Sequence, residues 1–141
     1  MNSEATPRMS APILPERWDL PGRPEGAPVT VQDAYRQTQF LLGGDLRLLG
    51  EGMNLQLQIV RDSSPSRYRT HALAAALMPW SRAFLALSDA VALTLHGSYA
   101  SCPPLVRTAC EGVAAAAQLS GEELPTFQAW LAQAFRPDET H

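Results

Sequence analysis

The feature that most constrains the fold is an apolar repeat between residues 73 and 95. Large apolar side chains recur there every three or four residues, which is the spacing of one face of an α-helix. They are Leu73, Leu77, Trp80, Phe84, Leu87, Val91 and Leu95. The other side of this stretch is also mostly apolar, so we expect a helix buried between neighbours or in an oligomer interface. Pro79 lies within the repeat and predicts a kink, or a division into two helices.

A second helix is predicted from Thr30, which can cap its N-terminus, to about residue 62. Its apolar stripe is again spaced by three and four residues and consists of Leu42, Leu46, Leu49, Met53, Leu57 and Val60. Four glycines, at positions 43, 44, 50 and 52, oppose this helix because glycine is a poor helix former. They predict either a bend or break near Gly43 and Gly44, or close packing of another backbone against the glycines.

Two further helices are predicted after the central one, whose end is marked by Gly97. Ser101 or Cys102 can cap the first of them, and its contact face has mostly small residues: Leu105, Ala109, Gly112, Ala116 and Leu119. Ser120 and Glu123 form a capping box for the last, amphipathic helix, which carries Leu124, Phe127, Trp130, Leu131 and Phe135. No alternating strand pattern occurs. The predicted fold is an all-α antiparallel bundle of about four helices, one kinked at proline.

Prolines crowd residues 1–29, which we therefore expect to form an extended or disordered arm. Its apolar residues Ile13, Leu14, Trp18 and Leu20 could dock on the body or on a partner protein, or the arm could be a loose tail. Residues 30–136 form the predicted helical domain, and residues 137–141 a tail. A chain of 141 residues corresponds to one domain.

Composition excludes several classes of function. A formal net charge of −3 makes general nucleic-acid binding unlikely. The most apolar stretch contains Arg82 and Asp89, so we expect a core helix there and no membrane span. Two cysteines and no secretory signal favour a reducing compartment, the cytoplasm. No histidine, cysteine or carboxylate spacing predicts a metal, and no glycine-rich loop predicts a nucleotide, so no cofactor is expected.

One polar constellation could carry chemistry. Arg82, Asp89 and His96 recur every seven residues on the central helix, and Arg107 and Glu111 share a face of the next one. In an antiparallel pair of helices, Arg107 could reach Asp89 while Glu111 approaches Arg82. The resulting layer is either a pocket for a small anionic or polar ligand, or a structural ion-pair network, or a set of solvated charges.

Cys102 is a candidate reactive thiol, because a cysteine at a helix N-terminus meets the positive end of the helix dipole. His96, six residues before it, could act as its base. The alternative is a small capping residue whose thiol has no chemical role.

The stretch "LHGSYASCPPLVRTACEG" resembles prokaryotic HEPN-like helical proteins, in which a helix ends in a Gly/Tyr turn and the next begins with an apolar-Arg-x-x-x-Glu pattern. Here the pattern is Val106, Arg107 and Glu111, and the resemblance covers about residues 70–120. It implies a helical bundle, dimerisation and, for the nucleases, an Arg-x(4–6)-His motif that cleaves RNA. Arg67 and His71 have only three residues between them, and no histidine follows Arg107 in range.

We therefore predict first a non-catalytic interaction or oligomerisation domain, which forms a dimer or larger assembly and whose arm could bind a protein partner. The second hypothesis is a ligand-binding or enzymatic bundle that uses the polar layer. The third is an RNA-acting, HEPN-like domain of a defence or toxin system.

Overall fold

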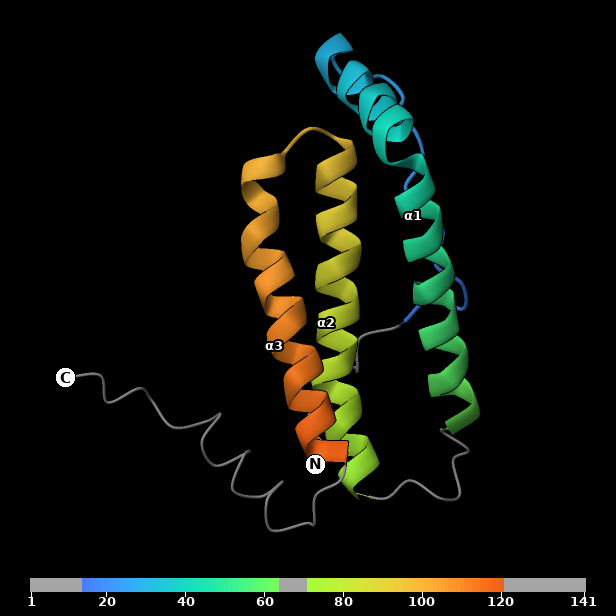
Figure 1. Ribbon diagram of the computed structural model, residues 1–141, viewed down its shortest axis with the longest axis vertical. Helices are drawn as coiled ribbons and strands as arrows, with labels where there is room; N and C mark the ends of the chain where they lie inside the picture. The colour runs from blue at the N-terminus through green and yellow to red at the C-terminus, as the bar shows by residue number, and fades with distance from the viewer. Residues whose placement is uncertain (1–13, 64–70, 121–141) are drawn as a thin grey trace, which may run out of the picture.

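A computed structural model describes residues 14–63 and 71–120 of the chain. Within them lie three α-helices, α1 (Val29–Ser63), α2 (His71–Leu95) and α3 (Cys102–Ser120), and a short 3-10 helix, η1 (Tyr99–Ser101). No strand occurs in this part of the chain. Figure 1 shows α2 between α1 and α3, as the apolar character of both its sides predicted. The all-α class is confirmed, whereas the predicted fourth helix and the tail lie outside the described residues.

Helices α2 and α3 form a tight antiparallel hairpin. Gly97 ends α2 with a positive φ of 81°, and the amides of Gly97 and Ser98 donate to the carbonyls of Thr94 and Leu93. This is the Schellman arrangement that glycine favours at a helix C-terminus. The hairpin contact consists mostly of small side chains, and Ala83, Ala86 and Ala109 are buried in it. The predicted close approach of these two helices is therefore present.

Gly112 is the point of closest approach in the hairpin. A Cβ atom placed on Gly112 would lie 2.7 Å from the carbonyl oxygen of Pro79 and 2.9 Å from the Cβ of Ala83. Only glycine allows the two backbones to come so near.

Pro79 does not divide the central helix. Helix α2 runs without interruption from His71 to Leu95, with Pro79 inside it, so the predicted division into two helices is wrong. Pro79 is buried where Gly112 of α3 meets its carbonyl group. Packing of α2 between two neighbours outweighs the loss of one backbone hydrogen bond at the proline.

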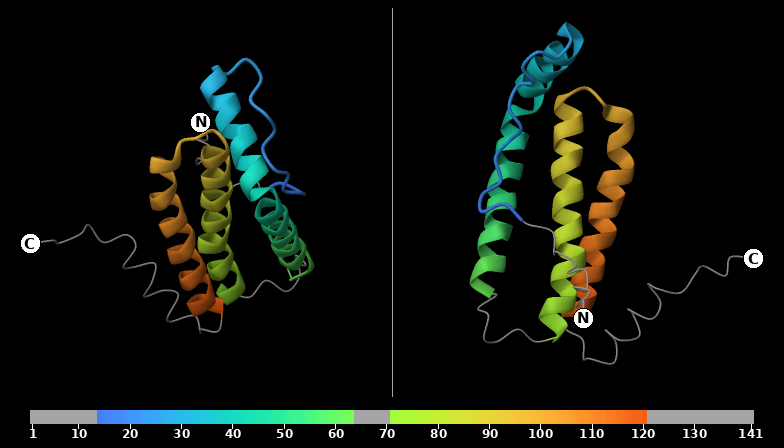
Figure 2. Two further views of the ribbon diagram at one scale, coloured as in Figure 1. Left: turned by 45° about the horizontal axis from the view of Figure 1, so that its top comes forward. Right: turned by 180° about the vertical axis from the view of Figure 1, so that it is seen from behind.

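Helix α1 is likewise a single element. It begins one residue before the predicted cap and continues through Gly43 and Gly44, bending in its N-terminal half without a break (Figure 1). Residues 14–28 form no helix or strand and return along α1, as Figure 2 shows in its right-hand view. The segment that precedes α1 in the sequence therefore lies alongside that helix.

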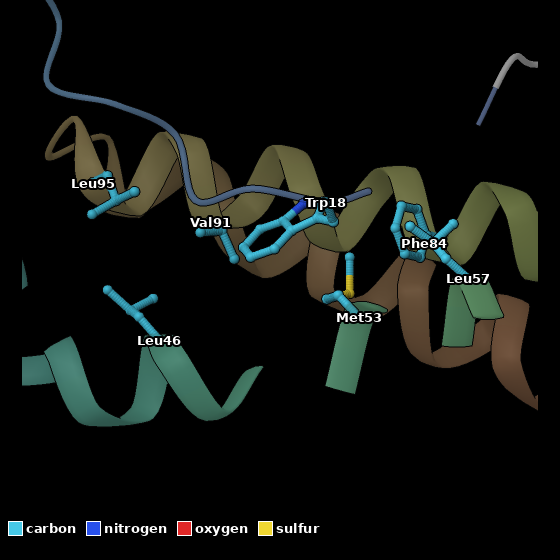
Figure 3. Close-up of a cluster of buried hydrophobic side chains, with 7 residues drawn as sticks. All are labelled: Trp18, Leu46, Met53, Leu57, Phe84, Val91 and Leu95. Atoms are coloured by element: carbon cyan, nitrogen blue, oxygen red, sulfur yellow. The ribbon is translucent and has the colours of Figure 1, made fainter. Parts of the chain in front are cut away.

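The main core lies between α1 and α2, and it includes a residue that precedes both helices. Trp18 is 5% exposed and lies among side chains from α1 and α2 (Figure 3). The cluster consists of Trp18, Leu46, Met53, Leu57, Phe84, Val91 and Leu95. Leu14 and Leu20 are half-buried against it. Of the three alternatives for the arm, docking on the chain's own body is the one that residues 14–28 show, and residues 1–13 lie outside the described part.

Candidate functional site

The segment before α1 is anchored to that helix by one side chain. Asn54 accepts a hydrogen bond from the backbone N–H of Trp18 through Oδ1 at 2.9 Å, and its Nδ2 donates to the carbonyl of Trp18 at 2.9 Å. The same Nδ2 also donates to the carbonyl of Gly50 at 3.0 Å. The ring of Trp18 lies against Gly50, where an added Cβ would be 3.2 Å from a ring carbon. Glycine and asparagine one turn apart thus form the seat for Trp18.

Two indole groups connect α1 with α2 by hydrogen bonds. Trp18, held on α1, donates from Nε1 to Ser88 Oγ of α2 at 2.9 Å, and Trp80 of α2 donates from Nε1 to Gln56 Oε1 of α1 at 3.1 Å. Trp80 also contacts Phe84, with ring centroids 5.5 Å apart. Each indole N–H therefore has a partner across the interface, which fixes the position of α1 relative to α2.

A third side of α1 is apolar and exposed. Four large side chains on it are more than half accessible: Leu41 at 73%, Leu48 at 69%, Leu55 at 57% and Ile59 at 53%. Gly44 and Gly52 lie between them, and nothing in the described structure comes within 4 Å of a Cβ added at either position. At 100° per residue these six positions form one stripe, roughly 140° or more around the helix from both the Trp18 seat and the buried Leu46, Met53 and Leu57. We call this stripe the outer face: Leu41, Gly44, Leu48, Gly52, Leu55 and Ile59.

The predicted polar layer is not assembled. Arg107 donates from Nε to Glu111 Oε1 at 2.7 Å within α3, and their side chains are 81% and 63% exposed. This hydrogen bond, and then the charge of Glu111, raise the pKa of Arg107. Arg82 and Asp89 are exposed, and neither makes an ion pair with a described residue. The expectation that Arg107 and Glu111 pair with α2 is therefore wrong, because the two residues satisfy each other.

Cys102 and His96 do not form a catalytic pair in the described structure. The Sγ of Cys102 lies 3.2 Å from Thr94 Oγ1 and is near the carbonyls of Ser98 and Ala90, at 3.5 and 3.6 Å. No hydrogen bond between described residues joins it to the half-buried His96. The thiol instead links the start of α3 to the end of α2. Cys102 and Cys110 are both free thiols.

An open groove runs beside the Trp18 seat, between residues 16–20 and α1. Its rim carries three arginines, Arg17, Arg47 and Arg61, together with the carboxylates of Glu16, Asp19 and Glu51. Because positive and negative side chains both line the groove, it favours neither an anionic nor a cationic ligand. Within residues 14–63 and 71–120, no three histidine, cysteine or carboxylate side chains gather as a metal site. None of the described helices is long and apolar enough to cross a membrane.

Comparison of the chain with protein-family models, with curated proteins and with solved structures gives no match. The resemblance to HEPN-like proteins therefore stays a prediction. The Arg-x(4–6)-His spacing does occur once in the sequence, at Arg136 and His141. Both residues lie outside the described part of the chain.

The outer face is the feature that sequence reasoning missed. The apolar spacing predicted the inner stripe of α1, of which Leu46, Met53 and Leu57 are buried. The signal for the outer face was a second apolar set with a period of seven, at positions 41, 48 and 55. Periodicity alone does not show which of two apolar stripes a single neighbouring helix will cover.

Proposed function

We propose that this protein is a non-catalytic interaction domain that works by self-association. One observation carries the proposal: the outer face of α1 exposes four large aliphatic side chains in a row, on a helix that is already held to the bundle by two other faces. Large contiguous apolar surface on a folded chain is typical of protein interaction sites.

The arrangement of the remaining side chains supports a non-catalytic role. Arg107 and Glu111 pair with each other at the surface, and Cys102 is hydrogen-bonded within the turn between α2 and α3. Neither set lines a cavity formed by the described residues, whereas the polar side chains of an active site converge on one.

The test is light scattering coupled to size-exclusion chromatography of the full chain over a concentration series. We expect a mass above the 15.3 kDa of one chain, rising with concentration. Leu41→Glu places a charge on the outer face, and we expect it to weaken association at least about tenfold. Val113→Glu is the matched control, because Val113 is a 54% exposed apolar residue on α3. A wild-type chain that stays monomeric at every concentration would refute the proposal.

A further inference from the structure

The outer face has a symmetry of its own along the helix. Counted from Leu48, glycine follows four residues away in both directions, at Gly44 and Gly52, and leucine seven residues away, at Leu41 and Leu55. From Leu41 to Leu55, reading this stripe from either end therefore gives the same order of side chains, and Ile59 lies beyond that repeat. A surface of this kind is self-complementary when a second copy runs antiparallel to the first.

We propose, building on the self-association above, that α1 pairs with α1 of a second copy, antiparallel, about a twofold axis at Leu48. Leu48 then meets the partner's Leu48 at the axis. Leu41 lies opposite the partner's Leu55, and Gly44 lies opposite the partner's Gly52.

The two glycines explain how the surfaces can fit. Gly44 and Gly52 flank Leu48 by one turn on each side, and the space where their side chains would lie is open. They leave a shallow depression on either side of the central leucine. In the antiparallel pair, Gly44 of each copy faces Gly52 of the other, and small residues let the helix axes come close on both sides of the central leucines.

Charge on the flank of the outer face fits the same register. Arg47 and Glu51 are exposed, on the side of α1 toward residues 16–20, and neither forms an ion pair with a described residue. The matching pair on α3, Arg107 and Glu111, has the same spacing and order and does form one. About a twofold axis at Leu48, Arg47 of one copy lies within about 3 Å, along the axis, of the partner's Glu51. The dimer thus offers two equivalent ion pairs, whereas a parallel dimer would place Arg47 and the partner's Glu51 on opposite flanks of the contact.

Cysteine cross-linking tests both the antiparallel direction and the register. In the full chain with Cys102→Ser and Cys110→Ser, we expect Leu48→Cys to form a disulfide with itself upon mild oxidation. Leu41→Cys mixed with Leu55→Cys should cross-link with each other, whereas each alone should not, because its two copies lie about 21 Å apart along the axis. A parallel dimer would give the reverse pattern for these two variants and would overturn the proposal.

Other outcomes separate this proposal from the self-association on which it rests. A dimer in which Leu48→Cys does not cross-link would overturn the α1 pair and leave self-association standing. A monomer would overturn both. A monomer in which the thiol of Leu48→Cys also resists a maleimide reagent would show that another segment of the same chain covers the outer face.

A charge reversal gives an independent readout. We expect Arg47→Glu and Glu51→Arg each to weaken dimerisation about tenfold, since each replaces two attractive contacts with two repulsive ones. The double variant should restore association to within about threefold of wild type. Additive weakening in the double variant would contradict the proposed contact.

Discussion

The two interfaces of the central helix are built in opposite ways. Toward α3, α2 presents alanines and the carbonyl of Pro79, and Gly112 lets the backbones meet almost directly. Toward α1, the space is filled by Phe84, Val91 and Leu95 and by Trp18, which comes from outside both helices. One helix can therefore have two kinds of interface. Small side chains give a short interhelix distance toward α3, and the inserted side chain of Trp18 fills a wider space toward α1.

The wider interface depends on a residue that is distant in sequence, which makes it the more vulnerable of the two. We expect Trp18→Ala to lower the free energy of unfolding by about 3–5 kcal/mol, because it leaves a cavity between α1 and α2. Urea titration followed by circular dichroism, at a fixed protein concentration, measures this loss. Trp18→Phe keeps most of the apolar contact and should lose less than half as much. A loss below about 1 kcal/mol for the alanine variant would show that α1 is held without the wedge.

The α2–α3 interface should be destabilised by an added side chain, because it has no room for one. In Gly112→Ala the new methyl group meets the backbone of Pro79 and the side chain of Ala83. We expect a net destabilisation of about 1–2 kcal/mol, after the gain in helix propensity is included. Gly43→Ala is the matched control, since nothing lies within 4 Å of its added Cβ, and it should gain up to about 1 kcal/mol. Equal effects at the two glycines, measured by urea titration, would contradict the close approach.

The seat of Trp18 can be weakened without touching the ring. Asn54→Ala removes the two hydrogen bonds to the backbone of Trp18, and we expect it to cost about 1–2 kcal/mol. Gln58→Ala, one turn further along α1 and exposed, should change stability by less than about 0.5 kcal/mol. The change in Trp18 environment can be followed by near-UV circular dichroism. An unchanged spectrum and stability in Asn54→Ala would show that the ring alone positions the segment.

The smallest expected effect concerns the hydrogen bond from Trp18 to α2. Ser88→Ala leaves the indole N–H without its partner and should cost about 1 kcal/mol. In a double-mutant cycle with Trp18→Phe, the two losses should not add, because both remove the same hydrogen bond. Strict additivity would mean that Ser88 and Trp18 act independently.

The parts of the fold that were predictable are those with a strong local signal. The apolar repeat located α2 and its buried position, and the run of small residues in α3 predicted the close contact that Gly112 makes. Pro79 misled because the cost of a proline inside a helix is a few kcal/mol, which burial on both sides of α2 can offset. Local spacing gives no measure of that tertiary contribution.

The site was less predictable because each of its side chains has several possible partners, and the sequence does not show which partner it contacts. Arg before Glu is the weaker order for an intrahelical pair, but the difference is only a few tenths of a kcal/mol, and Arg107 and Glu111 pair within α3. The sequence indicated that Trp18 could dock on the body of the protein. It did not indicate that Trp18 would lie against Gly50 and Asn54 of α1. The outer face became visible only once α2 and residues 14–28 were seen to occupy the other two sides of α1.

The central claim is that α1 uses separate faces to hold the fold and to bind a second copy. Sedimentation velocity of Leu48→Glu in the full chain, beside wild type at the same concentrations, tests it most directly. We expect a folded monomer, with the helical circular dichroism of dilute wild type, where wild type sediments as a dimer. A variant that still dimerises with unchanged affinity would contradict the assignment of the outer face as the binding surface.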